Sequence, residues 1–208
     1  MRDTRYKTGF TVVELLVALI ITSVIFTAVA TLSYALGAAN DATDDMSQKQ
    51  AQVRYATLRI SELIRHCKLM CGTVGNDLAI WRADDNNDGK INPAELVYLE
   101  SGQDRDRLQL LEFSWSGSWN LTISETQDIN TKSTLILACT ERQTVLVPEC
   151  SNVQFATDSS PPWSKVVNIT FDLAENGGMC QYQINAALRG WAGHLLDSSG
   201  EIVSIDDD

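Results

Sequence analysis

A long apolar run near the start of the chain limits what the chain can fold into. The run extends from Phe10 to Leu36 and contains a single charged side chain, Glu14. A helix needs roughly 20 apolar residues to cross the core of a bilayer, whereas the apolar part of a secretory signal peptide has about 7–15 residues. We therefore expect residues 10–36 to form a transmembrane helix. Cleavage by signal peptidase after the small residues at 37–39 is the alternative.

The charge distribution predicts the orientation of this helix. Residues 1–9 carry Arg2, Arg5 and Lys7 against Asp3, whereas the whole chain has a formal net charge of −11. Basic flanks stay on the cytoplasmic side of a membrane, so we expect the part after residue 36 to be extracytoplasmic. An acidic domain repels phosphate, so nucleic acid is not an expected partner.

Glu14 is the ionisable group that the apolar run must accommodate. A carboxylate inside a bilayer costs on the order of 2.5–3.5 kcal/mol at the centre and less near the interface. Two interpretations follow from this cost. Glu14 either has a charged or polar partner, or lies in the headgroup region.

The residues around Glu14 resemble a known family. The segment Gly9-Phe10-Thr11-Val12-Val13-Glu14-Leu15-Leu16, after a short basic leader, resembles the processing motif of type IV prepilins and type II secretion pseudopilins. Val12-Val13 is a conservative departure from the Leu-Ile or Leu-Val that the family favours. The resemblance implies that prepilin peptidase removes residues 1–9 by cleaving after Gly9, and methylates the new N-terminal Phe10. It also implies assembly with other pilin-like subunits at the inner membrane, where Glu14 meets the Phe10 amine of a neighbour.

The rest of the chain predicts an α+β fold. Residues 37–72 carry apolar side chains at three- and four-residue steps, typical of an amphipathic helix that ends at Gly72. Residues 73–208 contain short apolar stretches between turns, which predict an antiparallel β-sheet, with a hairpin turn at 175–178. The expected strands are Leu78–Arg82, Leu96–Glu100, Leu108–Phe113, Leu121–Ser124, Thr134–Cys139, Thr144–Val147, Val153–Ala156, Val166–Leu173 and Gln181–Arg189. We expect a pilin-like arrangement in which the long N-terminal helix, half membrane-embedded and half amphipathic, packs on this sheet.

Weaker resemblances concern the kind of subunit. Residues 52–65 and the stretches 153–155, 167–171 and 187–189 are similar to J-type minor pseudopilins and W-type minor pilins. They imply a minor subunit at or near a filament tip. A type II secretion system and a type IV pilus both stay open.

One acidic loop has the spacing of a calcium-binding loop. Residues 84–95 read DDNNDGKINPAE and fit the EF-hand pattern D-x-[DN]-x-[DN]-G-x5-E at every specified position. Calcium prefers about six to eight oxygen ligands. The expected ligands are Asp84, Asn86, Asp88, the carbonyl of Lys90, Asn92 through a water, and Glu95. The flanking stretches read as strands, so we expect a structural calcium ion rather than a sensor; a hairpin turn without metal is the alternative.

The chain is not expected to be an enzyme or to take a small-molecule substrate. It has no phosphate-binding glycine loop, GxSxG or HExxH motif. The five cysteines lack the spacing of a zinc site, so burial or disulfide pairing is expected, with the pairing left open. They are Cys67, Cys71, Cys139, Cys150 and Cys180. The sequence thus predicts a non-enzymatic pilin-like subunit; the alternative is a membrane-anchored calcium-binding extracytoplasmic module that does not polymerise.

Overall fold

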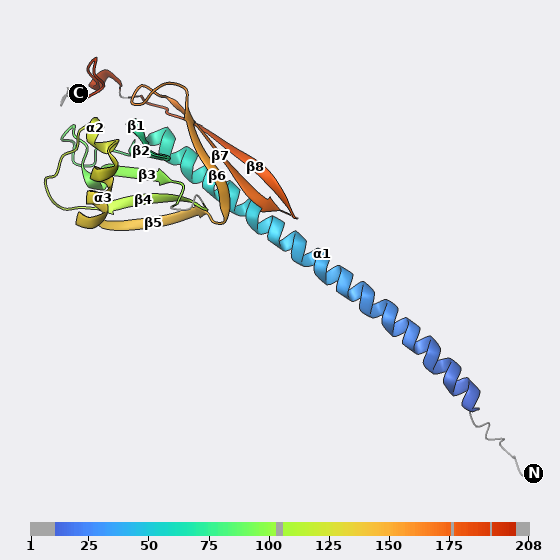
Figure 1. The fold of residues 1–208 in the computed structure, drawn as a ribbon. Helices are drawn as coiled ribbons and strands as arrows, with labels where there is room; N and C mark the ends of the chain where they lie inside the picture. Colours follow the sequence, from blue (N-terminus) through green and yellow to red (C-terminus); the bar gives the residue numbers. More distant parts are fainter. Residues whose placement is uncertain (1–10, 103–105, 176, 192, 203–208) are drawn as a thin grey trace, which may run out of the picture. The chain divides into compact units, whose positions relative to one another are not determined.

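The computed structural model describes residues 11–102, 106–175, 177–191 and 193–202, apart from the side chain of Ala42. Its longest element is helix α1 (Val12–His66), drawn from blue to cyan in Figure 1. The chain divides into two compact units after Gln48.

The first unit contains the apolar half of α1. Its large hydrophobic side chains from Val12 to Leu36 are exposed. Several of its hydroxyl groups are satisfied within the helix: Thr22 and Thr27, for example, donate to carbonyls four residues earlier, at 2.9 and 2.8 Å. Among the described residues, α1 is the one helix long and apolar enough to cross a membrane. An apolar surface with internally satisfied polar groups suits surroundings of lipid or other helices.

The second unit contains two antiparallel sheets. The first has the order β1-β2-β3-β4-β5 and the second β6-β7-β8. The strands of the first sheet are β1 (Leu69–Val74), β2 (Asp77–Trp81), β3 (Leu96–Glu100), β4 (Leu108–Ser114) and β5 (Thr140–Val147). Those of the second are β6 (Cys150–Thr157), β7 (Val166–Glu175) and β8 (Gly178–Ala187). Together with α1 they confirm the expected α+β class, with two sheets in place of one.

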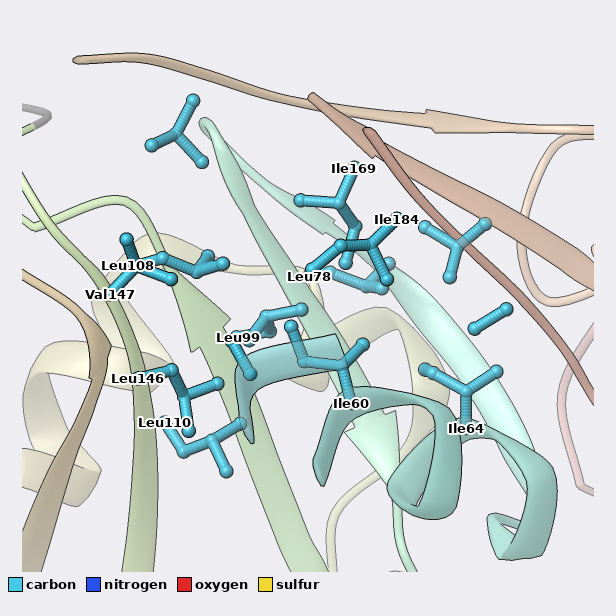
Figure 2. Packing of buried hydrophobic residues seen from close by; sticks show 14 of the residues in the cluster. Ile60, Ile64, Leu78, Leu99, Leu108, Leu110, Leu146, Val147, Ile169 and Ile184 are labelled. Atoms are coloured by element: carbon cyan, nitrogen blue, oxygen red, sulfur yellow. The ribbon is translucent and has the colours of Figure 1, made fainter. Parts of the chain in front are cut away.

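The second half of α1 joins the two sheets through a shared core. The helical spacing of Ala56, Ile60 and Ile64 places these side chains on one face, where all three are fully buried. Figure 2 shows Ile60 and Ile64 among side chains of both sheets. The labelled partners are Leu78, Leu99, Leu108, Leu110, Leu146 and Val147 from the first sheet, and Ile169 and Ile184 from the second. Each such aliphatic side chain contributes about 1.5–3 kcal/mol through burial.

The opposite face of the first sheet has its own core. It is covered by α2 (Ile123–Thr126), α3 (Ile129–Ala138) and η2 (Gly193–Leu195), while the short helix η1 (Pro93–Glu95) leads into β3. Alternate residues of β2 therefore enter different cores: Ile80 packs with α1, whereas Trp81 packs on the far side. All five residues of β3 are buried for the same reason.

A buried ion cluster fixes α3 to the first sheet. Lys132 Nζ lies 2.6 Å from Asp77 Oδ2 and 2.5 Å from Glu100 Oε1, and Gln109 Nε2 donates to Glu100 Oε2 at 2.8 Å. Burial alone would lower the pKa of Lys132, but its hydrogen bonds to the two carboxylates raise that pKa above the ordinary value. The ammonium group stays charged, as a buried ion pair requires.

Two sequence predictions about helices are corrected. The amphipathic helix ends at His66, not Gly72, because residues from Leu69 onward pair with β2. Gly72 does not end a helix; it allows the close approach of the Gln127 side chain, since a Cβ at Gly72 would lie 2.3 Å from Gln127 Cγ.

The predicted strands Leu121–Ser124 and Thr134–Cys139 are wrong. Those residues lie in or beside α2 and α3, and each of these helices begins after a capping residue. Thr122 caps α2, and Asp128 caps α3 by accepting from the N–H groups of residues 130 and 131.

The remaining strand predictions are confirmed with shifted ends, and the bounds of β3 are as predicted. The last hairpin is confirmed as well, because Glu175 pairs with Gly178 at the β7–β8 turn. The expected long helix and antiparallel pairing are therefore the framework on which the candidate sites lie.

The Asp158 carboxylate stabilises the segment between β6 and β7 through hydrogen bonds. Its Oδ1 accepts hydrogen bonds from Ser164 Oγ at 2.6 Å, Lys165 N at 2.9 Å and Val166 N at 3.0 Å. These hydrogen bonds lower the pKa of Asp158 from 3.8 to about 2. The carboxylate form is thus favoured in the folded state.

The depressed pKa of Asp158 predicts a pH-dependent contribution to stability. The contribution is present above the unfolded value of 3.8 and is lost as the pH falls through about 2. We expect Asp158→Asn to lower the thermal midpoint at neutral pH, and the difference from wild type to shrink between pH 4 and pH 2. Asp41→Asn, on the exposed surface of α1, is the control. A difference between Asp158→Asn and wild type that stays constant with pH would contradict the assignment.

Candidate functional site

The N-terminal motif begins at the edge of the described chain. Gly9 and Phe10, the expected cleavage and methylation residues, lie outside the described residues. Helix α1 starts at Val12 and has Glu14 in its first turn. Glu14 is exposed in the isolated chain.

Glu14 has a local partner that the sequence analysis missed. Its Oε2 accepts hydrogen bonds from Thr11 N at 3.0 Å and Thr11 Oγ1 at 2.9 Å. In return, Glu14 N donates to Thr11 Oγ1 at 3.3 Å. This is a capping box, and the Thr-x-x-Glu spacing is its sequence signal. The carboxylate also lies at the positive end of the helix dipole, where negative charge is stabilised.

The capping box has two features that matter for assembly. Thr11 and Glu14 both follow the expected cleavage point, so removal of residues 1–9 leaves both partners in place. The hydrogen bonds from Thr11 use Oε2 of Glu14, and Oε1 makes none with the residues that the structure describes. The first turn therefore holds the carboxylate in position with one oxygen available to a further donor.

The acidic loop connects β2 to β3, as its strand-like flanks predicted. Its ends meet through Arg82 N, which donates to the carbonyl of Glu95 at 2.9 Å. Asn87 and Gly89 have φ values of 55° and 65°, a conformation that glycine adopts without strain. Ile91 is fully buried, and its carbonyl accepts from Leu121 N at 2.8 Å. The loop is thereby anchored to the segment that leads into α2.

Two buried carboxylates stand at the ends of the loop. Asp84 Oδ1 accepts from Asp88 N at 3.1 Å, and Asp84 Oδ2 from Gly89 N at 3.0 Å. Glu95 Oε1 accepts from Asp85 N at 2.8 Å, and Glu95 Oε2 from Asn92 N at 3.2 Å. Glu95 is only 2% exposed and Asp84 9%. Backbone N–H groups thus stabilise both charges inside the loop.

The middle of the loop brings two carboxylates to one point. Asn92 Nδ2 lies 3.4 Å from Asp88 Oδ2 and 3.4 Å from Glu95 Oε2. Asn86 Nδ2 also donates to Asp88 Oδ2, at 2.9 Å, and the N–H of Lys90 donates to Asp88 Oδ1 at 2.9 Å. The carboxylates of Asp88 and Glu95 therefore converge on the partial positive charge of the Asn92 amide.

The oxygen donors of this loop fit the chemistry of calcium. Carboxylate and amide oxygens are the hard ligands that calcium prefers, and the expected ligands come from one short segment. Asp88 and Glu95 converge, but no group of three or more His, Cys, Asp or Glu side chains among the described residues is placed to hold a metal ion. The structure therefore places Asp88 and Glu95 beside the same amide, and calcium binding by the loop stays a prediction.

The five cysteines form neither a disulfide nor a metal site. All five thiols are free. Burial raises the pKa of Cys67 and of Cys71 to about 12, and that of Cys150 to about 11. These thiols stay protonated at neutral pH and act as small apolar groups of the core.

Comparison with known proteins supports the interpretation of the N-terminus. Residues 4–30 match the family model described as the prokaryotic N-terminal methylation motif. No curated protein and no solved structure matches the chain. The matched segment includes Gly9, Phe10 and Glu14, so it supports a type IV pilin-like protein that is anchored by its apolar helix, processed by prepilin peptidase and assembled with other pilins. The motif points to a structural subunit rather than an enzyme.

The role of Glu95 in the loop can be tested without metal. We expect Glu95→Ala to lower the free energy of unfolding by about 1–3 kcal/mol in the presence of a chelator, because two backbone N–H groups lose a buried acceptor. Urea unfolding of the full chain in detergent measures this. Glu62→Ala is the control, since the Glu62 carboxylate pairs with Arg59 at 3.7 Å on the exposed surface of α1, and its loss should change stability by less than about 0.5 kcal/mol. Equal effects of the two substitutions would contradict the buried role.

Proposed function

We propose that this chain is a minor pilin-like subunit, or pseudopilin, of a type II secretion or type IV pilus filament. Prepilin peptidase cleaves it after Gly9 and methylates Phe10. Helix α1 anchors it in the inner membrane, and the second unit is extracytoplasmic. The observation that carries the proposal is the methylation-motif match over residues 4–30, at the start of an exposed apolar helix.

The proposed assembly contact is electrostatic. Cleavage after Gly9 creates an amino group at Phe10, and N-methylation leaves its positive charge in place. We propose that this ammonium group donates to Oε1 of Glu14 in a neighbouring subunit, while Thr11 continues to hold Oε2. A low-dielectric environment strengthens such an attraction, and an unpaired carboxylate there is strongly disfavoured. The contact therefore defines the register between neighbouring helices as well as stabilising them.

The surface of α1 supports a role in assembly. The exposed apolar side chains between Val12 and Leu36 provide a large surface for lipid or for neighbouring helices. In the second unit, Tyr55 and Leu58 are 53% and 72% exposed on the amphipathic half of the helix. These two side chains lie in the segment that resembles minor pilin-like subunits, and we propose that they contact neighbouring subunits.

Processing and assembly can be separated by substituting Glu14. We expect Glu14→Ala to be cleaved after Gly9, methylated at Phe10 and inserted in the membrane, yet to be at least about tenfold depleted from the filament fraction, because the ammonium group of a neighbour loses its partner. Intact mass measurement of the mature chain reports processing, and co-sedimentation with sheared filaments reports assembly. Asp41→Ala, which removes an exposed carboxylate elsewhere on α1, should assemble normally. Normal assembly of Glu14→Ala, or a mature chain that retains Met1, would refute the proposal.

We also propose that the loop at 84–95 binds a structural calcium ion. The support is the EF-hand spacing, the buried carboxylates at both ends and the convergence of Asp88 and Glu95. Oxygens of Asp84, Asn86, Asp88, Glu95 and the carbonyl of Lys90 would hold the ion, with Asn92 acting through water. The bound ion would offset repulsion between carboxylates that now share amide donors.

Calcium binding predicts a change in both heat and stability. The expected dissociation constant is roughly 0.1–1 mM, as in extracellular modules. A tenfold excess of calcium over that constant should stabilise the full chain by about 1.4 kcal/mol. Calorimetry and thermal unfolding of the full chain in detergent measure these effects. Asp88→Asn should weaken binding, whereas Asp41→Asn should not. Absence of both heat and thermal shift at millimolar calcium would remove this part of the proposal.

A second candidate function is a membrane-anchored calcium-binding module that does not polymerise. The geometry of the acidic loop supports this module as much as it supports a calcium-binding pilin-like subunit, whereas the methylation motif favours the pilin-like subunit. Calcium binding by a chain that is never found in filaments would support the module. Processing at Gly9 together with Glu14-dependent assembly would support the pilin-like subunit.

A further inference from the structure

Strand β8 forms one edge of the second sheet. In the part of the chain that the structure describes, β8 pairs with β7 alone. Figure 1 shows the β7–β8 hairpin in orange and red, with β8 at the margin of its sheet. An edge strand presents unpaired N–H and C=O groups, and proteins usually protect such edges from pairing with another chain.

The other three described sheet edges carry recognised forms of protection. Strand β1 has a bulge between Met70 and Gly72, and the side chain of Gln127 donates to the Cys71 carbonyl at 2.8 Å. Strand β6 has a bulge between Ser151 and Gln154. Strand β5 carries the charged side chains of residues 141 and 142. Bulges, covering side chains and charges all oppose edge-to-edge pairing.

Strand β8 has none of these features. Its register with β7 runs without a shift from Gly178, opposite Glu175, to Ala187, opposite Val166. Its ten residues, GMCQYQINAA, include no Asp, Glu, Lys, Arg or Pro. It is therefore a long, regular and uncharged edge, which is the kind that pairs with another strand.

The geometry of β8 leaves both backbone and side chains accessible. In an antiparallel pair, every second residue directs its N–H and C=O groups away from the partner strand, so about five residues of β8 face the open edge. On one face of the strand, Met179, Gln181, Gln183 and Asn185 are exposed. On the other face, Ile184 and Ala186 are buried in the core.

We propose that β8 pairs edge to edge with β8 of a second copy of this chain. Two copies repel each other because each has a net charge of −11, so a contact between them is favoured where neither contributes a charge. A second copy offers an edge of the same length and the same regularity. Amide side chains of one copy meet amide side chains of the other, as in the side-chain ladders of paired strands.

Such a contact is self-complementary, which is the condition for a symmetric dimer. It joins two three-stranded sheets into one continuous sheet of a size that is common in globular proteins. It involves the second unit only and does not depend on Glu14, cleavage or the calcium loop. Its test is therefore separate from the tests of the proposed function.

The edge contact can be tested by placing lysines on β8. Sedimentation equilibrium of the full chain in density-matched detergent measures its oligomeric state. We expect wild type to dimerise and Gln181→Lys/Gln183→Lys to raise the dimer dissociation constant at least about tenfold, because like charges oppose each other across the new pair. The control Gln154→Lys/Ala156→Lys adds the same charge at exposed positions of β6, the opposite edge of the same sheet. It should dimerise like wild type.

Hydrogen exchange of wild type gives a second readout that needs no substitution. Amides of β8 should exchange more slowly as the protein concentration rises, while those of β6 should not change. This measurement decides the question if circular dichroism shows that the lysine variant is misfolded. A monomeric wild type, an edge variant that dimerises normally, or β8 exchange that is independent of concentration would overturn the proposal. Protection of β8 that needs a different pilin-like subunit would also overturn the second-copy assignment.

Discussion

The carboxylate of Glu14 is the charge around which an otherwise apolar helix has to be organised. In the isolated chain it accepts two hydrogen bonds from Thr11, which satisfies one oxygen and completes the first turn of α1. That local arrangement lets the helix begin next to the expected cleavage point, and it leaves the other oxygen without a hydrogen bond to the described residues. The same residue thus takes part in helix initiation and, in the proposed function, in the register between subunits.

The second unit depends on a different part of the same helix. Ala56, Ile60 and Ile64 form a continuous apolar stripe that packs into the core shared by both sheets. This part of α1 is therefore the helical layer against which both sheets pack. The far face of the first sheet is then left for α2 and α3 to cover. This division leaves the β2–β3 loop and the β8 edge at the surface, where the proposed ion and the proposed partner strand can reach them.

The sequence predicted the features with strong local signals. The apolar run, the helical stripe and strand β3 follow directly from hydrophobic patterning. Two helices were missed because apolar residues such as Leu135 outweighed the capping signals at Thr122 and Asp128. The glycine at position 72 suggests a helix end from sequence, whereas in the structure its small size allows the close approach of Gln127. At the candidate sites, spacing identified the loop and Glu14, but the Thr11 contact and the incomplete convergence of the loop carboxylates depend on side-chain geometry.

The proposed ion pair between Glu14 and the amino group of Phe10 joins two subunits, so it is measured most directly in assembled filaments. Filaments containing this chain with a ¹³C-labelled Glu14 carboxylate, and neighbouring subunits with ¹⁵N-labelled amino termini, permit a solid-state NMR distance measurement. The account predicts a dipolar coupling that corresponds to an N···O separation within about 4 Å, the range of an ion pair. A Glu14 carboxylate that contacts only Thr11 of its own chain in the filament would contradict it.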